Sequence, residues 1–186
     1  MRRRALLGAL GAGIAGGAGC LSAPGPDGLL GVPASETPWG EDWRTESVDR
    51  VVVDSGRAER TGIDASETTL TLPTATATFS LVNRTGDPLQ VNPHGWALWR
   101  RESDGWRGIY PDGYLQPLTA LRPGESISWA LRIDNRGTGQ GDVEIDTEGD
   151  LPTFAGIDPG RYAVSNEVRF SDQPVLVVSV FDIVGE

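Results

Sequence analysis

Apolar residues recur at every second position through much of the chain after residue 46. In the clearest run, at 126–133, apolar side chains alternate with small or polar ones, the apolar positions being Ile127, Trp129, Leu131 and Ile133. Successive side chains of a β-strand point to opposite faces, so this period predicts a strand with one face in a core. Residues 175–184 are apolar at nearly every position, which predicts a strand covered on both faces.

Turn sequences divide the rest of this region into short segments of the same kind. Strands are predicted at 47–54, 68–72, 78–81, 96–100, 106–110, 115–121 and 162–170, between turns such as Asn-Arg-Thr-Gly-Asp-Pro and Pro-Gly. No segment shows the apolar period of a helix. We therefore expect residues 46–186 to form one all-β antiparallel sandwich of about 7–9 strands. About 140 residues suffice to bury its core without a disulfide.

The charge balance excludes several classes of partner. All 16 basic residues are arginine, and 26 acidic residues give a formal net charge of −10. Such acidity argues against a sequence-independent nucleic-acid binder and against electrostatic binding to a membrane surface. One cysteine and one histidine exclude an intrachain disulfide and a multi-histidine metal site. We expect no cofactor and no metal.

Residues 1–19 are predicted to be a signal peptide. Three arginines precede an uncharged stretch rich in Ala, Gly and Leu at residues 5–19. As a helix this stretch would cover about 22 Å of a hydrocarbon core roughly 30 Å thick, too little for a stable membrane span. Arg3 and Arg4, followed by Ala5-Leu6-Leu7, resemble the twin-arginine signature of proteins that are exported already folded.

The only cysteine, Cys20, follows Gly17-Ala18-Gly19. This segment resembles a lipobox, although Gly17 stands where Leu or Val is usual. The resemblance implies that Cys20 carries a lipid and that the protein is anchored at the extracytoplasmic face of the cell membrane. The alternative is a plain signal peptide with an incidental cysteine. Residues 20–45 are rich in proline and glycine, which predicts a flexible linker.

Cleavage before Cys20 would remove three arginines and no acid, so the mature net charge would be −13. An acidic, lysine-free composition of this kind resembles that of haloarchaeal proteins. Molar salt screens the self-repulsion that such a charge causes in dilute buffer. A GC-rich genome would explain the absence of lysine, but it would not explain the sign of the charge.

A second resemblance concerns the fold. Asp158, Gly160 and Tyr162 match the corner motif that precedes strand F of immunoglobulin-like domains, with Val164 in place of the usual cysteine. The chain from 79 to 162 also resembles Ig-like domains of bacterial and archaeal envelope lipoproteins, through Asn83, 96–100, 104–106, 121–126 and 159–162. A weaker likeness is to the intracellular proteinase inhibitor family of bacilli. These resemblances imply an immunoglobulin-like β-sandwich and do not imply a particular activity.

Several residues are candidates for sites. Asn83-Arg84-Thr85 is a glycosylation sequon in a predicted loop. Trp96, Trp99 and Trp106 form the densest aromatic group, which would serve either as core packing or as a binding platform. Trp96 and Trp99 are three residues apart in a predicted strand, so they face opposite sides.

His94 and the acidic run at 142–150 are assigned structural roles rather than catalysis or metal binding. His94 lies in a turn sequence with no recognisable nucleophile elbow nearby, so we assign it to the turn. The acidic run at 142–150 fails the spacing of a calcium-binding EF-hand and fits a charged edge strand better.

The sequence thus predicts a lipid-anchored binding or structural module at the cell surface that is not an enzyme. Its expected partner is a protein or a glycan at the cell surface. The first alternative is a proteinase-inhibitor-like protein that acts through a protruding loop, at 137–150 or 111–116. The second alternative is a hydrolase in which His94 meets a hydroxyl or a carboxylate.

Replacement of Cys20 by serine tests the anchor. Serine has no thiol to receive the lipid, so we expect Cys20→Ser to move the protein from the membrane fraction to the medium, or to leave an unprocessed precursor. Cell fractionation with immunoblotting measures this. A normally processed Cys20→Ser chain that stays in the membrane fraction would contradict the prediction.

Overall fold

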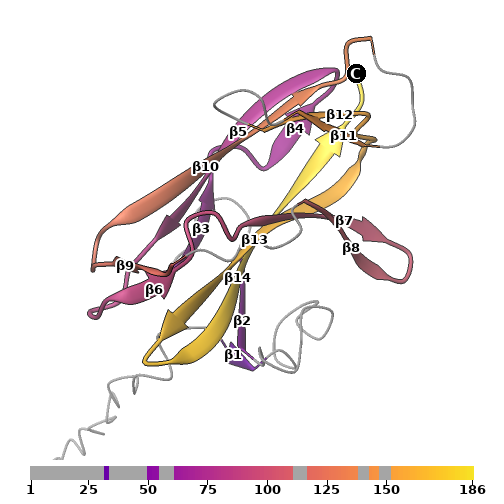
Figure 1. The fold of residues 1–186 in the computed structure, drawn as a ribbon. Helices are drawn as coiled ribbons and strands as arrows, with labels where there is room; N and C mark the ends of the chain where they lie inside the picture. The colour runs from indigo at the N-terminus through magenta and orange to yellow at the C-terminus, as the bar shows by residue number, and fades with distance from the viewer. Residues whose placement is uncertain (1–31, 34–49, 55–60, 111–116, 138–142, 147–151) are drawn as a thin grey trace, which may run out of the picture.

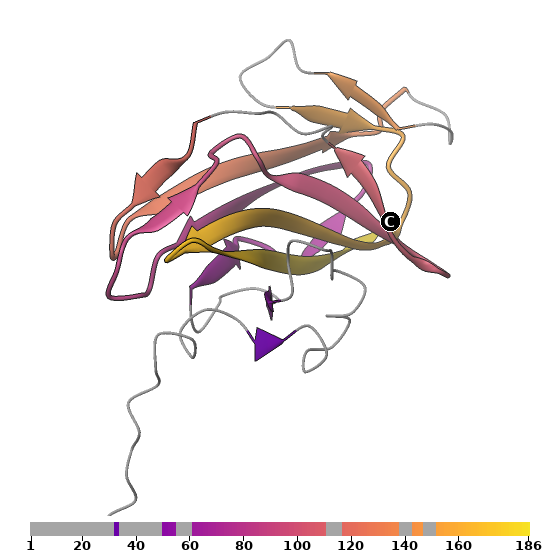
Figure 2. The same cartoon turned by 60° about the horizontal axis from the view of Figure 1, so that its bottom comes forward.

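The computed structural model describes residues 32–33, 50–54, 61–110, 117–137, 143–146 and 152–186. Within these ranges the regular structure is β-strand, in two layers that Figures 1 and 2 show, and the predicted all-β class is confirmed. The strands are β1 Val32–Pro33, β2 Arg50–Asp54, β3 Gly62–Ala65, β4 Thr69–Thr71, β5 Thr74–Val82, β6 Leu89–Val91, β7 Ala97–Glu102, β8 Gly105–Tyr110, β9 Thr119–Leu121, β10 Ser126–Asp134, β11 Glu144–Asp146, β12 Thr153–Ala155, β13 Gly160–Phe170 and β14 Gln173–Val184.

The larger sheet is built on the antiparallel pair of β13 and β14. Residues 160–170 pair one for one with residues 173–183. β2 and then β4 pair with the free side of β14, whereas β7 and then β6 pair with the free side of β13. β8 extends the sheet beyond β7, β9 extends it beyond β6, and β1 pairs with β2.

The smaller sheet has the order β11-β12-β10-β5-β3. Its longest contact joins β5 to β10 over the full length of both strands. The core lies between this pair and β13–β14, where the rings of Phe79 and Phe181 meet with centroids 5.1 Å apart. The neighbours β3-β5-β10 in one sheet and β14-β13-β7 in the other give the two-layer arrangement of an immunoglobulin-like sandwich.

Two details of the predicted sandwich are wrong. The described residues form 14 strands rather than seven to nine, because β1, β3, β6 and β12 are too short for an alternating pattern to mark them. The sheets are also not purely antiparallel, since β12 runs parallel to β10 and both β2 and β4 run parallel to β14. The chain passes from β2 to the other sheet in β3 and returns as β4, so β2 and β4 reach β14 in the same direction.

The period-two patterns are confirmed where the sequence shows them best. On β10, Trp129, Leu131 and Ile133 are buried and Arg132 between them is exposed. Residues of β14 pack on both faces, as predicted: Val177 and Phe181 belong to the main core, whereas Val178 and Val180 belong to a second cluster on the outer face.

The corner before β13 is closed by a side-chain hydrogen bond. The Tyr162 hydroxyl donates to the Asp158 carbonyl oxygen at 2.7 Å, and the Tyr162 side chain is almost fully buried. Arg100 on β7 donates from Nη1 to the Asp158 carboxylate at 3.0 Å, and its guanidinium lies 6.0 Å from the centre of the Tyr162 ring. Burial raises the pKa of the Tyr162 phenol, so the hydroxyl remains a proton donor at neutral pH.

Removal of the Tyr162 hydroxyl should weaken this corner without changing the fold. Tyr162→Phe keeps the ring against Phe181 and removes one hydrogen bond, so we expect the free energy of unfolding to fall by about 1 kcal/mol. Denaturant unfolding measures the change. An unaltered unfolding midpoint would show that the corner does not depend on the bond.

Candidate binding site

The hairpin of β7 and β8 extends from the body of the sandwich, as Figure 1 shows to the right of β13. Only the first part of β7 is paired with β13, at residues 97–100. A register shift between Leu98 and Trp99 marks a bulge, which increases the local twist of a strand pair. The exposed Asp104 leads into Gly105 at the tip, whose φ of 146° favours glycine.

Trp99 connects this hairpin to the larger sheet through packing and a hydrogen bond. Its ring lies over Gly108 of β8, where an added Cβ would be only 3.3 Å from the ring. Its indole Nε1 donates to Ser165 Oγ on β13 at 2.8 Å. The space left by Gly108 and the hydrogen bond to Ser165 thus fix the orientation of the Trp99 ring.

Trp106 lies next to Trp99 on the same face of the hairpin. Its cross-strand partner is Arg101, whose guanidinium is 5.7 Å from the centre of the Trp106 ring, within the range of a cation–π interaction. Both tryptophans are partly buried and pack against the outer-face cluster of Val51, Ala163, Val178 and Val180. Trp99, Arg101 and Trp106 therefore form one continuous surface, which we call the hairpin platform.

Trp96 does not belong to this platform, and of the two roles that the sequence leaves open for it the structure shows core packing. Its side chain is 7% exposed and its ring lies 5.0 Å from that of Tyr110 in the main core. The prediction that Trp96 and Trp99 face opposite sides is confirmed by their different clusters. Both are accommodated because this sheet has an apolar cluster on each face.

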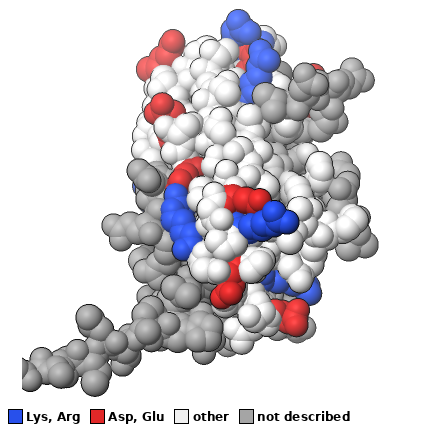
Figure 3. All heavy atoms as spheres, turned by 90° about the vertical axis from the view of Figure 1, so that its left-hand side faces the viewer, with Lys and Arg blue, Asp and Glu red and all other residues white. Residues whose placement is uncertain are grey.

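The hairpin is locally basic in an acidic chain. Residues 100–107 contain three arginines and two acids, whereas the chain has a net charge of −10. Arg107 is paired with Glu102, and this bond raises the pKa of the guanidinium further. On the opposite end of the molecule, which Figure 3 shows, acidic and basic side chains lie next to each other and neither sign forms a continuous patch.

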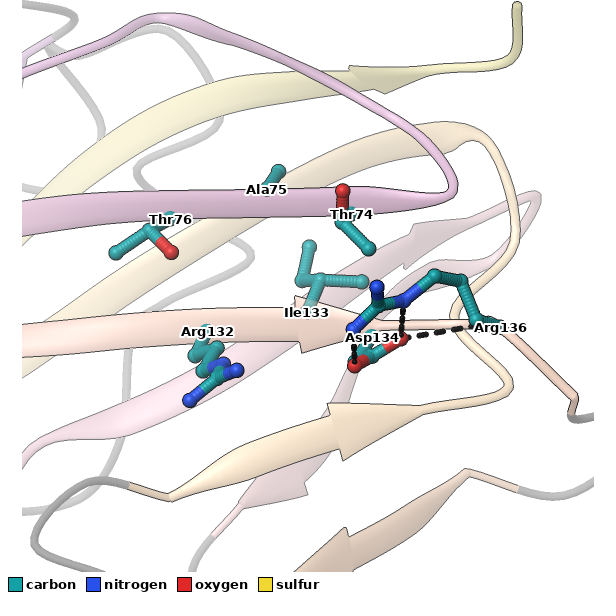
Figure 4. A pocket seen from close by; sticks show the side chains of 7 residues that line it. All are labelled: Thr74, Ala75, Thr76, Arg132, Ile133, Asp134 and Arg136. Atoms are coloured by element: carbon teal, nitrogen blue, oxygen red, sulfur yellow. Dashed lines mark hydrogen bonds and ion pairs between the residues drawn. The ribbon is translucent and has the colours of Figure 1, made fainter.

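A groove of about 460 Å³ lies on the outer face of the smaller sheet, over the ends of β5 and β10 (Figure 4). Its lining residues are Thr74, Ala75, Thr76, Arg132, Ile133, Asp134 and Arg136. Arg136 donates to both carboxylate oxygens of Asp134, at 2.9 Å and 2.7 Å. These hydrogen bonds lower the pKa of Asp134 to about 2, so the carboxylate is ionised at neutral pH. Sequence reasoning missed this groove, because it becomes visible only when β5 and β10 are paired.

Asn83, the possible glycosylation site, is buried in the folded chain. Its side chain has 0% exposure. Its Nδ2 donates to the carbonyl oxygens of Asp87 and Leu121, both at 2.8 Å, and its Oδ1 accepts from the backbone and the hydroxyl of Thr85. The atom that would carry the glycan is thus fully engaged in closing the loop. The spacing of Asn83, Thr85 and Asp87 could have indicated this structural role, because it is typical of side chains that hydrogen-bond to the backbone of their own turn.

The other predicted residues divide into two groups. Arg3, Arg4, Cys20 and the loop at 111–116 lie outside the described residues, as does most of the loop at 137–150. His94 is exposed in the predicted turn, where its amide donates to Asn92 Oδ1. β11 lies at the edge of the smaller sheet with Glu144 and Asp146 exposed, as predicted for a charged edge strand.

The described residues show neither a membrane-spanning helix nor a cluster of metal-ligating side chains. Within those ranges, no helix is long and apolar enough to cross a membrane. Nor does any group of three or more His, Cys, Asp or Glu residues in that part of the chain come together as metal ligands would.

No protein-family model and no curated protein sequence matches the chain. Among solved structures, it is similar to Pseudomonas fluorescens alkylpurine DNA glycosylase AlkC bound to DNA containing an abasic-site analog (16% identity, TM-score 0.32, 64% of this chain and 28% of that chain). It is also similar to a β-glucosidase from Listeria innocua in complex with laminaribiose (13% identity, TM-score 0.28, 70% and 17%). A third similar structure is the ASH / PapD-like domain of human CEP192 (12% identity, TM-score 0.31, 77% and 98%).

These likenesses concern the strand arrangement alone. The chain spans 28% and 17% of the first two proteins, and every TM-score quoted is far below the level at which an activity could be compared. The class of molecule therefore follows from the chain itself, which is an immunoglobulin-like β-sandwich with a projecting hairpin.

Replacement of Asn83 by alanine tests how much its hydrogen bonds stabilise the loop that follows β5. Asn83→Ala removes the side-chain donor to the Leu121 carbonyl oxygen and the acceptor of the Thr85 amide, so we expect the free energy of unfolding to fall by about 3 kcal/mol. The matched control is Arg84→Ala, which keeps Asn83 and removes only a partly exposed ion pair with Asp64, at a cost of about 1 kcal/mol or less. Mass spectrometry of the native protein should find Asn83 unmodified. A glycan at Asn83, or equal stability of the two variants, would contradict this account.

Proposed function

We propose that the protein is a lipid-anchored module of the cell surface that binds a partner through the hairpin platform and catalyses no reaction. Export in the folded state through the signal at Arg3 and Arg4, attachment through Cys20 and an acidic composition suited to high salt are parts of the same proposal. The part of the predicted linker that precedes β1 would hold the sandwich away from the membrane, since residues 32–33 pair with β2 in the larger sheet.

The observation that carries the proposal is the hairpin platform itself. Tryptophan and arginine are the residues that most often dominate binding energy at protein interfaces. Here they lie on a hairpin that extends from the sandwich (Figure 1), and the contacts of Trp99 with Gly108 and Ser165 hold them in one arrangement. A partner would thus meet a surface that needs little ordering on binding.

The chemistry of the hairpin platform favours an acidic protein or a glycan as the partner. The face of an indole ring packs against the apolar face of a sugar or of another side chain, and Arg101 offers a cation beside it. A nucleic acid is a poor partner for a chain with a net charge of −10.

Proteinase inhibition is the second candidate function. The hairpin supplies a projecting segment, with Ser103, Asp104 and Gly105 at its tip. Inhibition would require this tip to enter a protease active site, and a panel of purified proteases tests that directly. Inhibition by the wild-type chain that Asp104→Ala removes would favour this function over partner binding.

Crosslinking in intact cells tests the hairpin platform. A photoactivatable residue at Ser103 places the probe at the exposed tip, and the same residue at Glu67, which is exposed between β3 and β4, is the matched control. We expect a discrete crosslinked adduct from position 103 and none from position 67. Trp106→Ala combined with the probe at 103 should reduce the yield of the adduct at least about tenfold, as expected for a residue that contributes much of the binding energy.

Two outcomes would contradict the proposal. The first is equal crosslinking from positions 103 and 67, which would indicate random collisions at the surface. The second is an adduct from position 103 that Trp106→Ala leaves unchanged, which would separate binding from the hairpin platform.

A further inference from the structure

The groove on the smaller sheet is distinct from the hairpin platform. Its floor is formed by the outward faces of β5 and β10, where Thr76 lies directly opposite Arg132 and Thr74 lies opposite Asp134. On its other side Arg132 is paired with Thr153 of β12. Arg132 thus lies between Thr76 of β5 and Thr153 of β12 across the sheet. Figure 4 shows Arg132 and Thr76 on neighbouring strands.

The charges in the groove do not cancel. Both oxygens of Asp134 are engaged by Arg136, which pairs the only carboxylate of the lining with the arginine at the edge. Arg132 takes part in none of the ion pairs between described residues, and its side chain is exposed. The lining therefore has two arginines and one acid, a net charge of +1 on a chain of −10.

We infer that this groove binds an oxyanion, a carboxylate or a sulfate, that is carried on a sugar. The guanidinium of Arg132 presents two parallel N–H groups to one oxyanion, a geometry that an ammonium group cannot provide. The hydroxyls of Thr74 and Thr76 each donate and accept, which matches the hydroxyl groups of a saccharide beside the acid.

The dimensions and openness of the groove fit such a ligand. A volume of about 460 Å³ lies within the range of small-molecule sites. Its walls are the polar ends of two strands, so a polar ligand enters without losing all of its hydration. An exposed charge pair contributes little free energy, and we therefore expect weak binding with a dissociation constant of about 1 mM or higher.

The test is an NMR titration of the full chain with glucuronate and with glucose 6-sulfate in about 1 M KCl. At this ionic strength the Debye length is about 3 Å, so long-range attraction is screened while a hydrogen-bonded contact persists. We expect saturable shifts at residues 74–76 and 132–136 with at least one of the two acidic sugars. Which of them binds more tightly distinguishes a carboxylate site from a sulfate site. Glucose should bind at least about tenfold more weakly, because it lacks the group that Arg132 recognises.

Variants assign the effect to Arg132. Arg132→Gln removes the charge at an exposed position, so we expect the fold to persist and the affinity to fall at least about tenfold. Arg132→Lys keeps the charge but loses the planar pair of N–H donors, so its affinity should lie between those of the wild type and Arg132→Gln. Arg122→Gln is the matched control, because Arg122 is also exposed but lies in the turn before β10. Trp106→Ala should leave the titration unchanged, which separates this site from the proposed function.

Three results would overturn the inference. The first is the absence of saturable shifts with either acidic sugar. The second is inorganic sulfate binding as tightly as both sugars, which would mean an adventitious ion only. The third is an equal loss of affinity in Arg122→Gln and Arg132→Gln, which would mean a nonspecific effect of charge.

Discussion

The ladder between β13 and β14 is the contact on which the larger sheet depends. It runs without a break from the pair of Gly160 and Ile183 to the pair of Phe170 and Gln173, and β2, β4, β6 and β7 all attach to its two free sides. Its inner face carries Phe181 against Phe79 of the other sheet. Its outer face carries Val178 and Val180 beneath the tryptophans of the hairpin. The two strands therefore link the core of the sandwich to the candidate binding surface.

This arrangement explains how a projecting hairpin can be rigid. A two-stranded hairpin has little stability by itself in water, and it needs a third strand or a packed face to persist. Here β7 obtains both, through its pairing with β13 and through the packing of Trp99 against the outer-face cluster of the sheet. The same contacts hold Trp106 and Arg101 in place. Rigidity of this kind reduces the entropic cost that a partner would otherwise have to offset.

The parts of the fold that the sequence predicts are those fixed by local patterns. Alternation marks β10, continuous apolar sequence marks β14, and the spacing of Asp158, Gly160 and Tyr162 marks the corner. Features that depend on pairing between distant segments escaped prediction. The burial of Asn83 depends on the carbonyl of Leu121, which lies 38 residues away, and the groove at Arg132 depends on the register of β5 with β10. The parallel edges of the larger sheet have the same cause, since no local pattern records which side of a sheet a strand will reach.

Hydrogen–deuterium exchange measures most directly whether the hairpin is a rigid extension of the β13–β14 ladder. The account predicts that amides within residues 160–170 and 173–183 exchange last, and that amides of β7 paired with β13 at 97–100 exchange on a similarly slow timescale. The tip at 103–105 should exchange far sooner. Exchange of residues 97–100 as fast as that of the tip would contradict the account, because the hairpin platform would then have no fixed support.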